Sequence, residues 1–245
     1  MSAIGRFIGG AWRTGMAVSW TVVACNLALL VLLMGKGWSG WVLTRIGGQV
    51  WSANLLKWFT RGLTVEGPPN GVWPQRAIYV ANHSSYLDVN AIFASIPHPV
   101  IFLSKASVRK VPFLGWANAR VGTVFVERGK LDSAIRAAKD LNRALDEGKV
   151  VCVFPEGTRS SDGMLLPFKK GAFRLALDAG VPVVPFGIQG AREALPKGNF
   201  LIQKRPITIR FGAPISIEPF RETNDLDGLS AAARKAIEDL MVQRS

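Results

Sequence analysis

The sequence predicts a layered α/β domain with a mixed, largely parallel sheet, preceded by an N-terminal apolar helical membrane segment. Two observations lead to this prediction. Strand-like apolar runs alternate with helix-like patterns from residue 78 to residue 188, and the first 62 residues combine apolar stretches with tryptophan and no acid. The 245 residues therefore divide into a membrane-associated segment, residues 1–62, and a larger folded domain, residues 63–245.

The elements of the larger domain follow from apolar periodicity and from glycine and proline. Apolar or alternating runs predict five strands, at residues 78–80, 100–103, 122–128, 150–154 and 181–188. Amphipathic patterns predict three helices, at residues 131–145, 173–177 and 229–242. Gly148 and Gly180 follow the first two helices, as helix-ending glycines do. Pro182 and Pro185 indicate that the strand at 181–188 is an edge strand or is interrupted, because proline cannot donate a ladder hydrogen bond.

His83 and Asp88 are the residues that indicate a chemistry. They lie in the run Asn-His-Ser-Ser-Tyr-Leu-Asp, directly after the strand-like residues 78–80. The chain has two histidines, and the other one, His98, lies between two prolines with no acid close by in the sequence. If a hydroxyl must lose a proton near pH 7, His83 is the candidate base and Asp88 the group that orients it.

The five-residue spacing needs a turn of the chain between the two side chains, because residues five apart on one helix lie about 140° apart. Ser85 to Asp88 has the Ser-x-x-acid pattern of a helix start, which predicts Ser85 as the N-cap and Asp88 in the first turn. His83 would then lie on the preceding loop and fold back over this end. The alternative is that Asp88 only caps the helix and His83 is a polar loop residue.

Three further segments follow His83 in order: residues 122–128, residues 154–160 (Phe-Pro-Glu-Gly-Thr-Arg-Ser) and residues 181–185. With the His83 segment they resemble the four sequence blocks of the 1-acylglycerol-3-phosphate acyltransferase family of glycerolipid acyltransferases. The resemblance covers roughly residues 73 to 215, and the 154–160 segment matches its block residue for residue. It implies transfer of a fatty acyl group from an acyl thioester, on coenzyme A or acyl carrier protein, to a lysophospholipid. Lysophosphatidic acid is the common acceptor, and lyso-ornithine lipid or another lysophospholipid is the alternative.

Three cations follow strand-like runs: Lys105, Arg128 and Arg159. Open α/β sheets place ligand sites at the carboxyl ends of their strands, so we expect the three to converge on one sheet edge. A guanidinium can hold two phosphate oxygens at once. The pattern therefore predicts a site for the acceptor's phosphate.

The 154–160 loop supplies the other expected substrate-binding residues, Glu156, Gly157 and Thr158, beside Arg159. Glu156 is expected either to pair with Arg159 or to accept a hydrogen bond from the substrate. Backbone amides around Gly157 are candidate donors to the oxyanion of the tetrahedral intermediate.

The expected mechanism is direct transfer without an acyl-enzyme. His83 takes the proton of the acceptor hydroxyl as the oxygen attacks the thioester carbonyl, and Asp88 stabilises the imidazolium. Two other classes remain open. A hydrolase would use the same pair on water, and a non-enzymatic membrane or nucleic-acid binder would explain the charge alone; we expect no nucleic-acid partner.

The first 62 residues explain part of the net charge of +13, since they hold six lysines and arginines and no acid. They also hold six of the eight tryptophans, and tryptophan with cations around apolar helices is typical of a membrane interface. Residues 14–35 have no charge and could span a bilayer as one helix. Cations on both sides favour instead a two-helix hairpin that turns near residues 35–40 and enters one leaflet. We expect the chain at the cytoplasmic face of the cell inner membrane.

The two cysteines, Cys25 and Cys152, have neither disulfide nor metal spacing, and we expect no metal and no cofactor beyond the thioester co-substrate. The chain also lacks a Gly-x-Ser-x-Gly elbow, a Walker loop and a dinucleotide fingerprint, which argues against the usual hydrolase, nucleotide and hydride chemistries.

Overall fold

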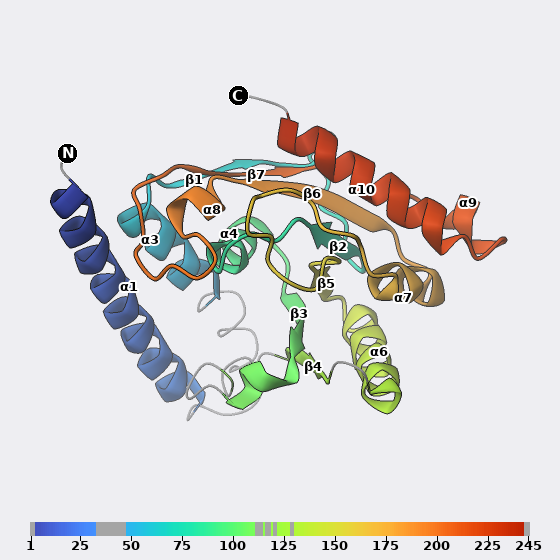
Figure 1. Cartoon of the computed structure of the whole chain (residues 1–245). Helices are drawn as coiled ribbons and strands as arrows, with labels where there is room; N and C mark the ends of the chain where they lie inside the picture. Colours follow the sequence, from blue (N-terminus) through green and yellow to red (C-terminus); the bar gives the residue numbers. More distant parts are fainter. Residues whose placement is uncertain are drawn as a thin grey trace.

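The strands in the middle of the sheet bury side chains on both faces. The computed structural model describes residues 3–32, 48–110, 115, 119, 122–127 and 130–242, and these form a seven-stranded sheet with the order β1-β7-β6-β2-β5-β3-β4 (Figure 1). The strands are β1 (Leu63–Glu66), β2 (Ile78–Ala81), β3 (Val100–Lys105), β4 (Val124–Val126), β5 (Val150–Val153), β6 (Val183–Gln189) and β7 (Ile207–Phe211). Six neighbouring pairs join them, and only β6 with β7 is antiparallel. The predicted mixed, largely parallel sheet is thus confirmed.

Helices cover both faces of this sheet and complete a layered α/β domain. The helices are α1 (Ala3–Leu32), α3 (Gln49–Phe59), α4 (Leu87–Ser95), α6 (Leu131–Asp146), α7 (Gly171–Ala179), α8 (Ala191–Ala194), α9 (Glu218–Arg221) and α10 (Leu226–Val242), with a 3-10 turn at Ala106–Lys110. Successive residues of a strand point to opposite faces. In β2, Tyr79 joins the core formed with α3, α4 and α8, whereas Ile78 and Val80 join the core formed with α6, α7 and α10. Figure 1 shows α10 and α4 on opposite faces of the sheet.

The strand at Val183–Gln189 decides between the two alternatives expected from Pro182 and Pro185, an edge strand or an interrupted strand. β6 lies inside the sheet, between β7 and β2, and is not an edge strand. It is interrupted on one side only. The carbonyl of Pro185 accepts a hydrogen bond from Gly212 N–H at 2.8 Å, so the missing N–H of Pro185 faces the β7 side. On that side the antiparallel pairing of β6 with β7 ends at Phe186. β6 is paired again only at Val183, which forms an isolated bridge with Ile215.

Strands β1 and β7 have no counterpart in the sequence prediction. Both run opposite to the other five strands and extend the sheet beyond β6. Arg210 on β7 is almost fully buried, and its guanidinium reaches both neighbouring strands. Its Nε lies 2.7 Å from Glu66 Oε2 on β1, and its NH1 donates to Gln189 Oε1 on β6. A buried charge with two oxygen partners ties these three strands together.

The N-terminal segment is helical, but the helix differs from the expected one. α1 begins at Ala3 rather than near residue 14, so it includes Arg6 and Arg13, and the 30 residues extend about 45 Å. No helix within the described ranges is long and apolar enough to cross a membrane. The turn expected at residues 35–40 lies outside the described residues.

Helix α3 packs into the larger domain although it precedes residue 63. Its residues Leu55, Leu56 and Phe59 are buried in the same core as Tyr79 of β2. α1 reaches this core through Ala17. The domain boundary at residue 62 stays a prediction, but the packing makes α3 part of the hydrophobic core beneath the sheet.

We predict that Leu56→Ala lowers the free energy of unfolding of the full chain by about 2–5 kcal/mol, because it leaves a cavity at a fully buried site. Val50→Ala, at an exposed position of the same helix, should change it by less than about 0.5 kcal/mol. Urea unfolding followed by tryptophan fluorescence measures both. Equal midpoints for the two variants would show that α3 is not part of the cooperative folding unit.

Candidate active site

The candidate site forms where the central parallel strands end. His83 comes two residues after β2, and the 154–160 loop follows β5, which pairs with β2 in parallel. The two loops therefore leave the same edge of the sheet side by side. Lys105 ends β3, the next strand along this edge. The parallel strands β2, β5 and β3 thus end at the same edge. The convergence of the three cations stays a prediction, and Arg128 lies outside the described residues.

Asp88 organises the loop that carries His83. Its Oδ2 accepts three hydrogen bonds, from Ser84 N–H at 2.7 Å, from Ser85 N–H at 2.8 Å and from His83 Nδ1 at 2.8 Å. The carboxylate is fully buried, and no donor among the described residues reaches its Oδ1. Since an ionised carboxylate only accepts, the hydrogen between Asp88 and His83 belongs to Nδ1. The other ring nitrogen, Nε2, is then the basic one.

The helix that presents Asp88 begins later than expected. α4 starts at Leu87, with Tyr86 at the N-cap position, so Ser85 is not the N-cap residue. Ser85 Oγ still accepts the N–H of Leu87 at 3.1 Å, and it donates to the carbonyl of Leu195 at 2.8 Å. The shift places Ser84 and Ser85 before the helix, where their backbone N–H groups can turn toward Asp88.

The imidazole ring lies flat on Phe154. The two ring centroids are 3.9 Å apart, and the ring planes differ by 12°. The side chain of His83 remains 17% exposed, while Asp88 is closed off from solvent. Phe154 therefore fixes the plane of the ring, Asp88 fixes its Nδ1 edge, and one edge remains open to a substrate.

Glu156 holds the backbone of His83 in place. Its Oε1 accepts the N–H of His83 at 2.7 Å, and its Oε2 accepts the N–H of Leu166 at 2.9 Å. The carbonyl of His83 accepts the N–H of Ser160 at 2.7 Å. Glu156 is buried, and this burial raises the pKa of its carboxyl, while the N–H groups of Leu166 and His83 oppose the rise. Each carboxyl oxygen of Glu156 thus accepts a hydrogen bond from a backbone N–H of the protein itself.

Arg159 stacks on Tyr86 instead of pairing with Glu156. Its guanidinium carbon lies 3.7 Å from the centre of the Tyr86 ring, and its carbonyl accepts a hydrogen bond from Lys197 Nζ at 2.7 Å. Among the described residues no carboxylate pairs with this guanidinium. A half-buried guanidinium held by an aromatic face keeps its N–H groups for an anionic ligand.

The turn that carries Arg159 depends on Gly157. Gly157 has a positive φ of +68°, and its N–H donates to the carbonyl of Phe154 at 3.0 Å. A Cβ at this position would lie 3.0 Å from Lys169 Nζ. Thr158 is exposed at the tip of the loop. The structure thus brings His83, Asp88 and residues 156–159 together, as the sequence predicts.

Two site residues were missed by sequence reasoning. Asn82 makes two hydrogen bonds with the backbone of Ile188, one from its Nδ2 and one to its Oδ1, both 2.8 Å long. These bonds continue the pairing of β2 with β6 for one more residue, so His83 leaves the sheet at a fixed point. Lys197 contacts the site from a loop that carries no recognisable motif. An amide directly after a strand could have indicated Asn82, but nothing in the sequence indicates Lys197.

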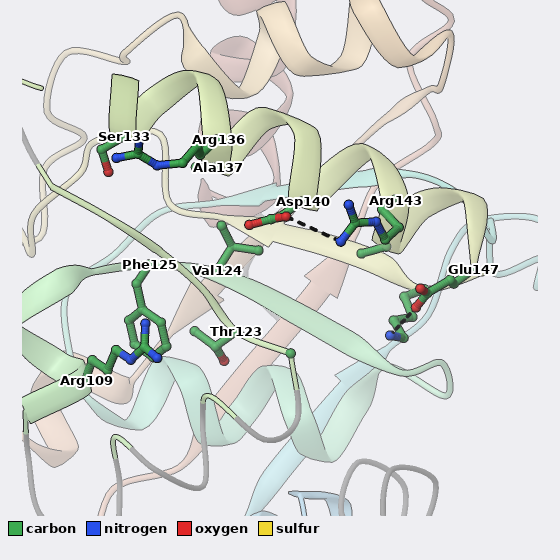
Figure 2. A pocket seen from close by; sticks show the side chains of 13 residues that line it. Arg109, Thr123, Val124, Phe125, Ser133, Arg136, Ala137, Asp140, Arg143 and Glu147 are labelled. Carbon is green, nitrogen blue, oxygen red and sulfur yellow. Dashed lines mark hydrogen bonds and ion pairs between the residues drawn. The ribbon is translucent and has the colours of Figure 1, made fainter. Parts of the chain in front are cut away.

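Two cavities adjoin the sheet. One, of about 470 Å³, borders the His83 loop, and its lining includes Asn82, Ser84, Met164, Ile188, Arg192 and Arg205. The other, of about 420 Å³, runs between β4 and α6 and contains no expected site residue (Figure 2). In this groove Arg143 pairs with Asp140 at 3.6 Å, and Lys149 pairs with Glu147 at 2.5 Å. Two of the four cations that line this groove, Arg143 and Lys149, are thus paired with acids.

Comparison with known proteins identifies the family. A family model described as acyltransferase matches residues 62–189, more than half of the chain. The chain belongs to the acyltransferase family. This acyltransferase is 32% identical over 203 residues to a 1-acyl-sn-glycerol-3-phosphate acyltransferase of Limnanthes alba, with 81% of this chain and 70% of the relative covered.

Further relatives agree with this assignment. A 1-acyl-sn-glycerol-3-phosphate acyltransferase of Saccharomyces cerevisiae is 32% identical, with 89% of this chain and 73% of the relative covered. The coconut (Cocos nucifera) protein of that name is 31% identical over 82% of this chain, which spans 65% of that relative's length. The crystal structure of PlsC, a 1-acyl-sn-glycerophosphate acyltransferase of Thermotoga maritima, is also similar. It has a TM-score of 0.80 and 25% identity, and the match covers 98% of this chain and 99% of that one.

We predict that Glu156→Ala destabilises this acyltransferase by up to roughly 6 kcal/mol, because two partly buried backbone N–H groups lose an acceptor that is worth at most about 3 kcal/mol each. Glu156→Gln should cost less, since its amide oxygen can still accept one of them. Both variants should lower kcat with little change in the acceptor KM, because the backbone of His83 loses a hydrogen bond that holds it in place. Glu193→Ala, at an exposed carboxylate, is the control. Unchanged stability with a raised acceptor KM would instead assign Glu156 to substrate binding.

Proposed function

We propose that this chain transfers a fatty acyl group from an acyl thioester to the sn-2 hydroxyl of 1-acylglycerol-3-phosphate, giving phosphatidic acid for phospholipid biosynthesis. The observation that carries the proposal is the contact of 2.8 Å between His83 Nδ1 and Asp88 Oδ2, which leaves Nε2 as the basic nitrogen of a partly exposed ring. The names of the relatives support the acceptor. The donor is acyl-coenzyme A or acyl-acyl carrier protein.

The proposed reaction proceeds in one transfer without an acyl-enzyme. His83 Nε2 takes the proton of the acceptor hydroxyl while the oxygen attacks the thioester carbonyl. The tetrahedral intermediate then collapses, the carbon–sulfur bond breaks, and the imidazolium returns its proton to the leaving thiolate. Asp88 holds the tautomer and stabilises the imidazolium, as the carboxylate of a Ser-His-Asp triad does. The chain's own residues supply the base, and the reaction needs no metal or cofactor beyond the thioester.

The acceptor's phosphate is proposed to bind at Arg159. Its guanidinium is held by Tyr86 and has no carboxylate partner among the described residues, which supports this role. Lys105 and Arg128, which follow the neighbouring strands, are proposed to complete the site. Gly157 and Thr158 form the turn that presents Arg159, so they are proposed to line the substrate.

The proposed location is the cytoplasmic face of the inner membrane, where both substrates are accessible. α1 exposes a set of large apolar side chains: Ile4, Phe7, Ile8, Trp12, Met16, Val18, Val22, Val23 and Leu27. Residues 1–62 carry six cations and no acid, which suits an anionic lipid surface. A helix with such a surface can lie in one leaflet without spanning it.

The first prediction of this proposal is that His83→Ala and Asp88→Asn each lower the transfer rate by at least about 10²-fold, the usual contribution of a general base. Asp88→Asn keeps an oxygen that can accept hydrogen bonds, but a neutral amide no longer stabilises the imidazolium. Labelled acyl thioester and lysophosphatidic acid measure the rate, and circular dichroism checks folding. Near-normal transfer by a folded His83→Ala variant would remove the base assignment. Release of free fatty acid at the same rate without acceptor would show a hydrolase.

The second prediction is that Arg159→Lys raises the KM for lysophosphatidic acid more than the KM for the thioester, because an ammonium cannot form the bidentate contact with phosphate. Arg136→Lys, in the groove of Figure 2, is the control and should change neither KM. A rise in the thioester KM alone would reassign Arg159 to the donor.

A further inference from the structure

The loop that joins α8 to β7, residues 195–206, binds α1 along its backbone. Thr14 Oγ1 donates to the carbonyl of Phe200 at 2.8 Å and accepts the N–H of Ile202 at 2.9 Å. Arg13 Nε donates to the carbonyl of Ile202 at 2.9 Å. Gly10 lets the two backbones approach closely, since a Cβ there would lie 3.2 Å from Leu201 Cβ. Figure 1 shows this orange loop beside the blue helix.

Phe200 points away from this contact into solvent. Its exposed fraction of 76% is unusual for a phenylalanine whose backbone is fixed on both sides. On α1, Phe7 and Val18 lie seven residues before and four residues after Thr14, so they share the side of the helix that Phe200 adjoins. Both are exposed. Phe200 therefore extends the apolar surface of α1 onto the larger domain.

The 195–206 loop and the adjoining part of α1 carry positive charge. Residues 195–206 contain three cations, Lys197, Lys204 and Arg205, and no acid. Arg6 and Arg13 lie on the adjoining helix, in a segment that also has no acid. An exposed aromatic residue within a positively charged surface is typical of contact with anionic lipid.

We propose that the 195–206 loop is a second membrane-binding element, which inserts Phe200 into the same leaflet as α1 and places its cations at anionic headgroups. This inference rests on the proposed use of a membrane-resident acceptor. It also explains why Lys197 reaches the active site. Lys197 lies three residues before Phe200, and its Nζ donates a hydrogen bond to the carbonyl of Arg159. In the same loop, the carbonyl of Leu195 accepts a hydrogen bond from the hydroxyl of Ser85, which belongs to the His83 loop. A bilayer that holds Phe200 thereby sets the depth of Arg159 and His83.

A fluorescence experiment tests the contact without turnover. In the full chain with Cys25→Ala, the variant Phe200→Cys is labelled with a polarity-sensitive fluorophore, and Val242→Cys is labelled as the control. Val242 is equally exposed, at 77%, but it lies on α10 over the opposite face of the sheet. Vesicles of phosphatidylglycerol and phosphatidylcholine should shift the emission of the probe at 200 to the blue and leave the probe at 242 unchanged. An unchanged probe at 200 on vesicles that sediment the protein would overturn the proposal.

A binding experiment with unlabelled variants provides the second test. Phe200→Ser should weaken sedimentation with the same vesicles on the order of tenfold, whereas Phe200→Leu should stay close to the parent and Val242→Ser should have no effect. Transfer to lysophosphatidic acid in vesicles should fall with Phe200→Ser and be kept in detergent micelles. Equal binding by Phe200→Ser and the parent would overturn the proposal. If the parent binds vesicles through Phe200 but transfers no acyl group, the proposed reaction fails while the membrane contact stands.

Discussion

The site depends on one buried carboxylate. A carboxylate removed from water costs several kcal/mol unless hydrogen bonds replace its hydration, so the folded chain must bring donors to Asp88. Two of these donors are the backbone N–H groups of Ser84 and Ser85, and the third is the ring of His83. Hydrogen bonds to a charged group contribute about 1.5–3 kcal/mol each. The interactions that make the burial of Asp88 possible are therefore the same ones that orient the imidazole.

This requirement links two segments that lie about seventy residues apart in the sequence. The loop around Asp88 leaves the N–H and the carbonyl of His83 pointing outward, and the 154–160 loop satisfies both, through Glu156 and Ser160. Phe154 of the same loop stacks on the imidazole ring. The parallel pairing of β2 with β5 makes this possible, since it starts both loops from neighbouring strand ends. The two motifs thus form one structural unit, and a change in either is expected to move the base.

Much of the fold follows from periodicity, and the exceptions have physical causes. The buried strands at Val100–Lys105 and Val150–Val153 and the helix that ends before Gly148 could be read from local patterns. Pro185 suggested an edge strand, but local sequence does not show on which side its missing N–H falls. β1 and β7 were missed because their stability comes from pairing between distant segments and from the buried Arg210. The roles of Glu156 and Lys197 were likewise unpredictable, since each depends on a partner far away in the sequence.

The position of α1 matters for the proposed reaction on a lysolipid. A lysolipid exposes its hydroxyl and phosphate at the headgroup level while its acyl chain remains in the bilayer, so a base on a rigid sheet edge must be held at that depth. The contacts of Arg13 and Thr14 with the 195–206 loop fix α1 to the domain, and Lys197 in the same loop contacts Arg159. These contacts form a short chain from a helix with an exposed apolar surface to the backbone of Arg159, whose guanidinium is proposed to bind phosphate. In the proposed reaction, a link of this kind would let the energy of lipid binding position the acceptor hydroxyl against His83, which an unanchored domain could achieve only at an entropic cost.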